Sequence, residues 1–481
     1  MKYETTIGLE VHAQVLTKSK MFSGCSAAYA SAPANTVIDE VSIALPGTLP
    51  VINAEAVLKA AQTGLALHCH VAEYCEFSRK SYTYPDLPKA WQITMYDKPI
   101  CEHGHLDITT SAGETRRIGI TRLHLEEDTG MLQHGDASHS LVDYNRAGVP
   151  LMEIVSEPDI KTPEEARLYA QKLRQIVVYL GVNSGNLEEG ALRFDANISI
   201  RPAGQQEFGT KVEIKNMNSF RNLERALHYE IERQRMVLES GGTLYQETRG
   251  WDEATGTTVS QRSKEHAHDY RYFPEPDLPP LLLSREWVEL RRAELPELPD
   301  AKLARFLSEY GLSEQDATLL SGERETAAYF EQVLATAGAD KAKPVANWIV
   351  GELFRLLKDG EETLADVATR VTPANLTSLV EVVANGEIGS TVAKQVFEEM
   401  YRSGDSPTAI INAKGLRQIS DSGVLVSAAR AAIEANPKVV ADYRSGKAAA
   451  IKFLVGQVMR STKGQANPQL AEEALRTELD G

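Results

Sequence analysis

The chain has 481 residues, of which 42% are hydrophobic and 25% are charged, so it is long enough for about two to four globular domains and is not a disordered sequence. Its formal net charge of −16 argues against a non-specific nucleic-acid-binding protein, which usually shows a basic face. Four cysteines exclude a disulfide framework and favour a reducing cytosol. No apolar run is long enough to span a bilayer, and the N-terminal residues lack the apolar core of a signal peptide, so we expect a cytoplasmic protein without a membrane segment.

Residues 1 to about 290 combine strand and helix patterns. Short β-branched runs bounded by turn residues predict strands at 6–12, 117–123 and 196–200. Helical spacing predicts helices at 53–67, 162–180 and 219–241. The second helix has the clearest start, because Thr162 can cap it, Pro163 occupies its first position and two acids follow. These patterns predict a large α/β domain.

The chain changes character after two proline-rich stretches, 274–280 and 295–299. Strand patterns fade beyond them, and the spacing predicts helices at 301–310, 313–320, 324–337, 343–357, 373–384 and 390–402. A second break at 403–407 precedes further short helices. We therefore predict an α/β domain over 1–293, an all-α domain over 294–404 and a small all-α tail over 405–481.

Polar side chains recur on one face of several predicted strands. Alternate residues of a strand share a face. This alternation places Glu10 with His12, and Glu126 with Asp128, whereas Glu127 points the opposite way. The same rule puts Asp195 on the face of its strand that carries two further polar residues.

Glu153 lies inside the apolar run 151–155, where a carboxylate must be hydrogen-bonded, paired or bound to a cation. Several carboxylates with one imidazole suit a hard divalent cation such as Mg²⁺, which commonly bridges to substrate phosphates. For any single pair, solvated residues of an edge strand are the alternative. The sequence leaves open whether the strands that carry these side chains converge.

A phosphate-handling segment follows at 211–220. The chain contains no Gly-x-x-x-x-Gly-Lys-Ser/Thr loop, so an ATP site would be of a less common type. Lys211 and Lys215 share a predicted strand face, and Asn216 and Asn218 precede a helix start, where amide donors and the helix dipole favour anions. Ordinary helix capping is the alternative explanation for the two asparagines.

Several segments resemble the B subunit of the tRNA-dependent amidotransferase. The closest resemblance is at 142–154, which reads Val-Asp-Tyr-Asn-Arg-Ala-Gly-Val-Pro-Leu-Met-Glu-Ile. Segments 79–92 and 211–220 also resemble the family, as does the tail at 453–468. The resemblance implies a cradle-shaped catalytic domain, a helical domain and a tail domain. It also implies ATP-dependent conversion of Glu-tRNA(Gln) or Asp-tRNA(Asn) to the matching amide, with Mg²⁺ as cofactor.

The resemblance assigns roles to the candidate residues. It implies a metal site formed by Glu10, His12, Glu126, Glu153 and Asp195. The catalytic residues would be Glu10, Glu126 and Lys215. The ATP and phosphate contacts would be Lys211, Lys215, Asn216 and Asn218. Lys89 and Glu127 would line a polar path that brings ammonia to the activated carboxylate.

The resemblance also implies partners. No Gly-x-Ser-x-Gly elbow for glutamine hydrolysis occurs, so ammonia would come from a glutaminase subunit, held with this chain and a small linking subunit in a heterotrimer. The other partners would be misacylated tRNA and a non-discriminating aminoacyl-tRNA synthetase. In the tail, basic residues exceed acidic ones between 438 and 463, and Lys452, Arg460 and Lys463 are the candidate tRNA contacts.

Two other functions stay open from the sequence. A tRNA-binding scaffold subunit would use the acids only structurally, although such a protein has no need of a buried acid set. A stand-alone ligase using free ammonia on a small substrate would have no need of a basic tail.

Overall fold

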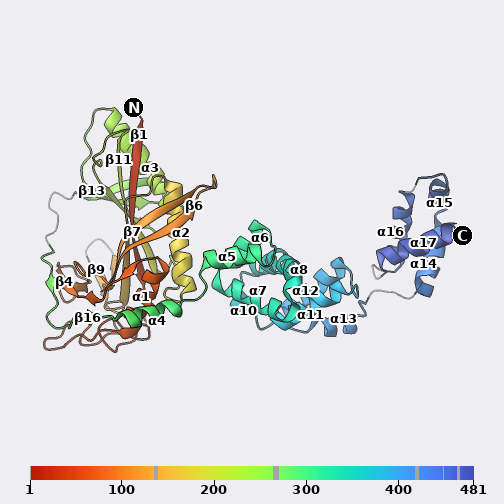
Figure 1. The fold of residues 1–481 in the computed structure, drawn as a ribbon, viewed down its shortest axis with the longest axis horizontal. Coiled ribbons are helices and arrows are strands. Elements are labelled where there is room, and N and C mark those ends of the chain that lie inside the picture. Colours follow the sequence, from red (N-terminus) through yellow and green to blue (C-terminus); the bar gives the residue numbers. More distant parts are fainter. Residues whose placement is uncertain are drawn as a thin grey trace. The chain divides into compact units, whose positions relative to one another are not determined.

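The computed structural model describes residues 2–134, 139–263, 270–417, 422–447, 449–462 and 466–480. It divides into two compact units, Met1–Pro299 and Asp300–Gly481, which we call the N-terminal and C-terminal units (Figure 1). The N-terminal unit contains a mixed sheet with helices, and the C-terminal unit contains helices. The predicted fold class, an α/β domain followed by helical parts, is therefore confirmed.

One large sheet forms the frame of the N-terminal unit. Its strand order is β14-β13-β12-β11-β1-β10-β7-β5-β4-β15, with β6 also on β7 and β2 on β6. Strands β12 and β13 are parallel, and the other pairs are antiparallel. The strands are β1 (Tyr3–Gln14), β2 (His70–Val71), β4 (Ser78–Ser81), β5 (Trp91–Thr94), β6 (Cys101–Thr109), β7 (Thr115–Glu127), β10 (Pro150–Ser156), β11 (Leu192–Pro202), β12 (Val212–Met217), β13 (Glu247–Asp252), β14 (Thr257–Ser263) and β15 (Phe273–Pro274).

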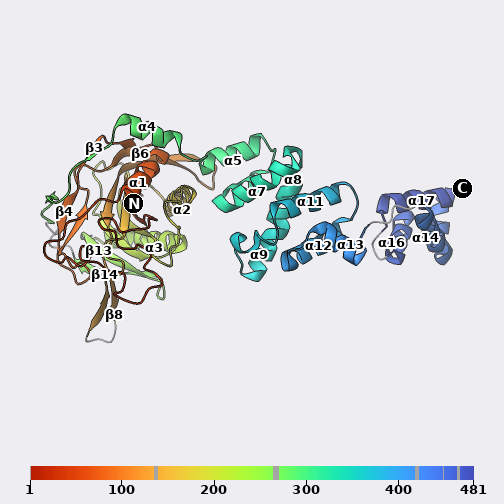
Figure 2. The same cartoon turned by 90° about the horizontal axis from the view of Figure 1, so that it is seen from below.

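Two small ribbons accompany this sheet. Strand β3 (Tyr74–Cys75) pairs with β16 (Leu281–Leu282), and β8 (Met131–His134) pairs with β9 (Ser140–Asp143). The β8–β9 ribbon projects from the N-terminal unit (Figure 2). Strand β10 begins at Pro150, two residues after Gly148, whose φ of 85° is left-handed, a conformation that glycine adopts without steric cost.

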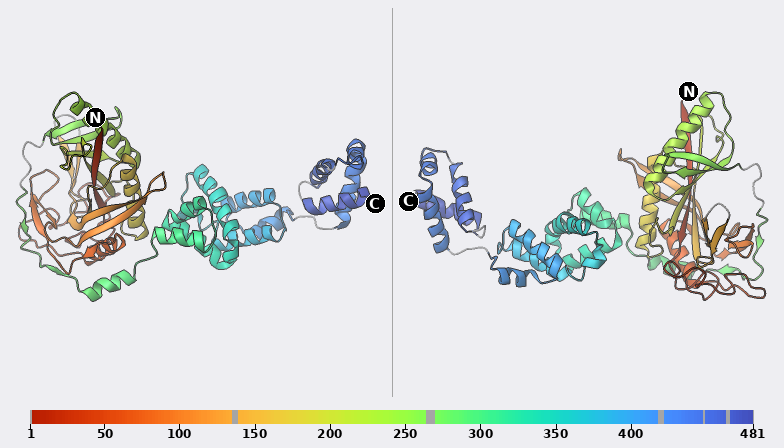
Figure 3. Two further views of the ribbon diagram at one scale, coloured as in Figure 1. Left: turned by 45° about the horizontal axis from the view of Figure 1, so that its top comes forward. Right: turned by 180° about the vertical axis from the view of Figure 1, so that it is seen from behind.

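The two faces of the sheet differ in polarity because residues of each strand alternate. In β1, Leu9 and Val11 are fully buried on one face, while Glu10 and His12 lie on the other. The apolar face packs in one core with α1 (Ala54–Ala66), α2 (Pro163–Tyr179) and α3 (Phe220–Glu239). The rear view in Figure 3 shows α2 and α3 lying lengthwise beside the strands. The polar face is thus left for chemistry.

The predicted helices of this unit are confirmed to within about two residues. Each starts at a side-chain cap: Asn53 for α1, Thr162 for α2 and Ser219 for α3. These short-range contacts explain why the sequence predicted them well. The unit ends with α4 (Arg285–Ala293).

The C-terminal unit contains helices throughout its described residues. They are α5 (Pro299–Ser308), α6 (Glu314–Ser321), α7 (Arg324–Ala337), η1 (Ala339–Lys341), α8 (Ala342–Asn347), η2 (Trp348–Leu353), α9 (Phe354–Gly360), α10 (Leu364–Val367), α11 (Pro373–Ala384), α12 (Ser390–Ser403), α13 (Pro407–Lys414), α14 (Ser422–Ala435), α15 (Pro437–Arg444), α16 (Ala450–Ser461) and α17 (Pro468–Asp480). The helix predicted at 343–357 is interrupted by η2, a π-helical segment.

Two separate hydrophobic cores lie in this unit. The first extends from Phe306 to Ile411, and the second from Leu425 to Leu479. Ile410 and Ile411 of α13 belong to the first core, although they follow the break at 403–407. The three-domain division with boundaries at 293/294 and 404/405 stays a prediction. None of the helices in the described ranges is long and apolar enough to cross a membrane.

Candidate active site

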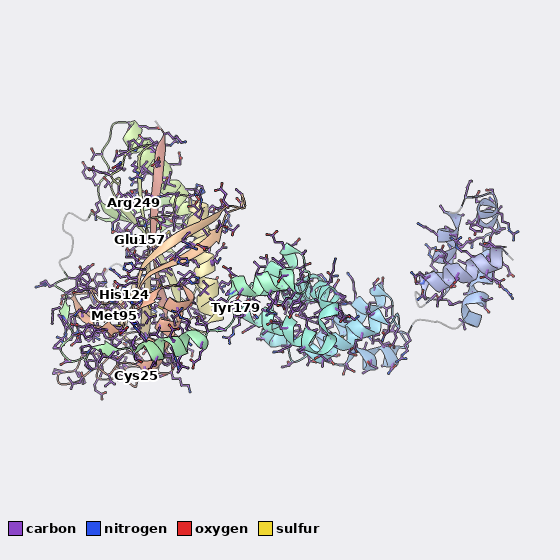
Figure 4. The ribbon with its side chains drawn as sticks, in the orientation of Figure 1. Cys25, Met95, His124, Glu157, Tyr179 and Arg249 are labelled. Atoms are coloured by element: carbon purple, nitrogen blue, oxygen red, sulfur yellow. The ribbon has the colours of Figure 1, made fainter. Side chains whose placement is uncertain are left out.

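Strand pairing aligns three of the predicted site strands. His12 of β1 lies opposite Glu153 of β10, and Glu153 lies opposite His124 of β7. Opposite residues of antiparallel strands project from the same face, so the three side chains form a row on the polar face. Glu126, two residues after His124, adds a carboxylate to the same face. His124 is labelled in Figure 4.

His12, Glu126 and Glu153 bring their possible metal-ligand atoms close together, and we call these three residues the donor group. One ligand atom from each of His12, Glu126 and Glu153 lies within 4.8 Å of the others, and no other group of three His, Cys, Asp or Glu residues in the described ranges is this close. His12 Nε2 is 3.5 Å from Glu153 Oε2, and so is His124 Nε2. Thr94 Oγ1 donates to Glu126 Oε2 at 3.0 Å. Two carboxylates and an imidazole are donors that fit a divalent cation.

Glu10 and Asp195 lie beside this group rather than in it. They face each other across the β1–β11 pairing, on the polar face. Glu10 Oε1 accepts a hydrogen bond from Asn197 Nδ2 at 2.7 Å, and Asp195 Oδ2 accepts one from Lys215 Nζ at 3.0 Å. The five predicted metal ligands therefore share one face of three adjacent pairings, but three of them form the close group.

The electrostatics reflect charge gathered in a poorly solvated place. Burial, together with the charge of Glu153, raises the pKa of Glu10. Burial also opposes ionisation of Glu153, but His124 and His12 outweigh it and hold the pKa of Glu153 well below its usual range. Burial lowers the pKa of His124. Such a set of shifts is typical of functional sites.

A pocket of about 350 Å³ lies over the donor group. It is lined by residues of β1, β4, β5, β7, β10, β11 and β12, among them His12, Lys80, Glu126, Asp195, Lys215 and Asn216, and by Asn218, which follows β12. This cavity, which we call the acidic pocket, brings Glu126 and Asp195 together with three of the four predicted phosphate-binding residues, Lys215, Asn216 and Asn218. Lys211 is exposed, precedes β12, and is not among the residues that line this pocket.

A bulge in β12 shapes the phosphate side of the pocket. The β11–β12 register shifts between Phe194 and Ala196, and Asn216 has a left-handed φ of 66°. Asparagine tolerates this conformation better than most residues. Although burial opposes its charge, Asp195 and Glu213 raise the pKa of Lys215. Lys215 is therefore a cation held beside the acids.

The predicted pair of Lys89 and Glu127 is present. Lys89 Nζ forms a buried ion pair with Glu127, whose Oε1 also accepts from the backbone of Ile93 at 3.0 Å. Lys89 also lines a second pocket, of about 230 Å³, with residues of the 41–50 loop and Arg79. Neighbouring glutamates of β7 thus contact different surroundings, Glu126 the acidic pocket and Glu127 the lysine.

Three contributors were missed from the sequence. His124 shares the face of Glu126, and strand alternation could have identified it. Lys80 and Arg193 also line the pocket. Arg193 pairs with the buried Asp128 at 3.2 Å, so Asp128 has a cationic partner within the protein. In the tail, Lys452 and Arg460 are exposed on α16, whereas Lys463 lies outside the described residues.

Comparison with known proteins decides the family. Residues 5–289 match the GatB/GatE catalytic domain, and residues 328–479 match the GatB domain. The chain belongs to the amidotransferase B-subunit family. It is 82% identical to the B subunit of the aspartyl/glutamyl-tRNA(Asn/Gln) amidotransferase of Herpetosiphon aurantiacus over 480 residues, which cover 100% of this chain and 99% of the relative. The protein of the same name from a Roseiflexus species is 56% identical, with the same coverage.

The family resemblance drawn from the sequence is therefore confirmed. The GatB/GatE catalytic match covers most of the N-terminal unit, including every residue of the acidic pocket. The relatives are named as subunits, which makes an amidotransferase B subunit one part of a multi-subunit enzyme.

Proposed function

We propose that this chain carries the amide-forming step of a tRNA-dependent amidotransferase, in the cytoplasm. Its substrates would be Glu esterified to tRNA(Gln), Asp esterified to tRNA(Asn), or both, with ATP as the activating reagent. The observation that carries the proposal is the close group of His12, Glu126 and Glu153, of which His12 and Glu126 line one pocket with Lys215. The names of the relatives specify both tRNA substrates.

The chemistry requires an activated carboxylate. A carboxylate oxygen of the substrate side chain attacks the γ-phosphorus of ATP, ADP leaves, and an acyl phosphate forms. Ammonia then attacks the acyl carbon, phosphate leaves with the former carboxylate oxygen, and the nitrogen loses a proton. The reaction class is a carbon–nitrogen ligase with glutamine as the amido donor.

His12, Glu126 and Glu153 are the residues we propose to hold Mg²⁺, because their donor atoms converge. When bound, the ion would neutralise charge on the transferred phosphoryl group. Asp195 adds a carboxylate to the pocket lining, and Glu10 lies opposite Asp195 on the neighbouring strand. Asn197 orients Glu10, and Asp195 holds Lys215 at 3.0 Å, so Lys215 is positioned to contact phosphate oxygens.

Asn216 and Asn218 extend the phosphate-binding side of the pocket. The left-handed backbone of Asn216 is a local strain at a pocket wall, which favours a binding role over simple capping. Capping of α3 is supplied by Ser219, whose side chain accepts from Asn222 N. Lys211, outside the pocket, is dropped from the phosphate contacts that we propose.

The ammonia would come from a partner. We propose a glutaminase subunit and a small linking subunit in a heterotrimer, with ammonia passing the buried Lys89–Glu127 pair. Misacylated tRNA would contact Lys452 and Arg460 of the tail, and Lys463 by its place in the sequence.

The test is ATP turnover by the assembled complex. ADP release should require Glu-tRNA(Gln) or Asp-tRNA(Asn), and should be absent with uncharged tRNA or with correctly acylated Gln-tRNA(Gln). ADP release without any tRNA would favour the stand-alone ligase instead. If ADP release and amidation both survive loss of the pocket carboxylates, the chain is a scaffold and the proposal is wrong.

A further inference from the structure

A row of four tyrosines begins at the acidic pocket and ends at the surface. Tyr82 packs edge-on against Tyr270, with ring centroids 5.9 Å apart, and Tyr270 packs edge-on against Tyr272 at the same distance. Tyr272 stacks on Tyr96, with centroids 3.9 Å apart and planes only 4° apart. We call these four residues the tyrosine row.

The row is attached to the strands that carry the acids. Tyr82 lines the pocket together with Glu126 and His12. Its hydroxyl donates to Gln92 Oε1 at 3.3 Å, and Gln92 Nε2 donates to the backbone oxygen of Glu127 at 2.7 Å. Two hydrogen bonds therefore fix the Tyr82 ring relative to the end of β7.

The far end of the row follows a backbone hydrogen bond between the end of β5 and β7. Met95 N donates to Leu125 O at 3.2 Å, which places the end of β5 beside the β7 segment with His124 (Figure 4). Tyr96, the next residue, is 45% exposed. An aromatic group built only to fill a core would be enclosed, whereas this one opens to solvent at one end and to a polar pocket at the other.

Lys80 joins the aromatic and acidic parts. Its Nζ lies 5.2 Å from the ring centroid of Tyr270 and 5.8 Å from that of Tyr82. It also lines the pocket with Glu126. The order of rings, lysine and acids fits a nucleotide. The rings would meet its flat base, and the lysine and the pocket would meet the anionic or ester-bearing groups at its other end.

We propose that the tyrosine row binds the adenine ring of a nucleotide substrate, with Tyr82 nearest to the reacting end in the acidic pocket. This inference rests on the proposed function, whose two substrates each contain an adenine. In ATP the base is linked to the γ-phosphoryl group through ribose and phosphates. In the acylated tRNA, the terminal adenosine carries the amino-acid ester. The shared chemistry is base–aromatic stacking.

The experiment uses the assembled complex with Tyr82→Ala, Tyr82→Phe and Tyr272→Ala. Steady-state amidation is measured in two arms, one varying ATP at saturating misacylated tRNA and one varying the tRNA at saturating ATP. Tyr245→Ala is the matched control, because Tyr245 is 73% exposed in the same unit and lies outside the row. Thermal unfolding of each variant identifies any that fail to fold.

We expect Tyr82→Ala to raise one KM about 5- to 150-fold, the change that corresponds to a base–aromatic stack, with kcat changed less than about 3-fold. Tyr82→Phe retains the ring and should raise that KM less than about 3-fold. A raised KM for ATP assigns the row to ATP, and a raised KM for tRNA assigns it to the terminal adenosine.

The inference is overturned if folded Tyr82→Ala and Tyr272→Ala variants leave both KM values at the level of Tyr245→Ala, or if only kcat falls. Failure of the proposed function is a different result, because the unsubstituted complex would then show no ATP-dependent amidation at all.

Discussion

Charged side chains are buried on the polar face of the sheet, whereas they are exposed on the tail helices α14–α17. On the sheet, His124 and Glu126 are each 3% exposed, and their partners Glu153 and Thr94 come from strands distant in sequence. On the tail helices, Arg430 pairs with Glu478 while its side chain is 64% exposed. Buried charges are strongly coupled to their neighbours, whereas exposed pairs are screened by water and salt.

The difference teaches where each kind of function can lie. The phosphoryl chemistry that we propose would need fixed charges in a poorly solvated place, and the buried charges of the sheet meet this requirement. The tRNA contacts that we propose would need accessible cations, and Lys452 and Arg460 are exposed on α16. Substitutions in the two regions should therefore differ in size and in kind.

The largest effect is expected from Glu126→Gln. Loss of one carboxylate from the close donor group should reduce amidation by on the order of 10³-fold, because the phosphoryl charge is no longer stabilised. Binding of misacylated tRNA, measured by filter retention, should change less than about 3-fold. A variant that loses tRNA affinity but still turns over bound substrate would contradict the role given to Glu126.

Glu230 is a buried carboxylate outside the proposed active site, so its substitution tests what burial alone contributes to stability. It is fully buried, accepts from Arg233 and Thr258, and lies 3.5 Å from Arg249, away from the acidic pocket. Glu230→Ala should lower the free energy of unfolding by about 3 kcal/mol, since it leaves buried donors unpaired. Denaturant unfolding measures this, and Arg430→Ala, which breaks an exposed pair, should leave the unfolding midpoint unchanged. If both variants shifted the unfolding midpoint equally, buried and exposed ion pairs would not differ in their contribution to stability.

Lys89→Ala should act on ammonia delivery. Glutamine-dependent amidation should fall about 10-fold or more, while amidation from high free ammonium should stay near that of the unsubstituted complex, because Lys89 contacts Glu127 rather than the donor group. Lys98→Ala is the matched control, since Lys98 forms an exposed pair with Glu76 on the same unit. Equal loss with both nitrogen sources would place Lys89 in the amide-forming step itself.

The smallest effect is expected in the tail. The double variant Lys452→Ala, Arg460→Ala should weaken tRNA binding several-fold at moderate salt and reduce the slope of log affinity against log salt by about two, one per lost phosphate contact. Glutaminase activity of the complex without tRNA should be unaffected. An unchanged salt slope would return these residues to an ordinary solvated helix face.

Local signals explain which parts of the fold could be predicted. The start of α2 needs only Thr162 and Pro163, and both act within one turn of the helix. Strand alternation likewise paired Glu10 with His12 and separated Glu126 from Glu127. In each case the deciding contacts lie within a few residues.

The rest depends on contacts that no short segment contains. Lys211 precedes β12, so the alternation that had grouped it with Lys215 does not extend to it. The bulge at Asn216 is set by pairing with β11. The tyrosine row forms because β15 pairs with β4, so that Tyr270 meets Tyr82 and Tyr272 packs on Tyr270. The π-helical turn at 348–353 has no signature in the 3.6-residue period.

The end of β7 has a consequence for insertions and deletions. Glu126 and Glu127 are adjacent, yet one contributes to the donor group and the other pairs with Lys89. A single residue gained or lost between His124 and Glu126 would turn each of the two glutamates to the opposite face, since the side-chain period of a strand is two. Length variation should therefore be tolerated in the β8–β9 ribbon but not in this stretch. A library of single-codon insertions selected for growth would map that boundary directly.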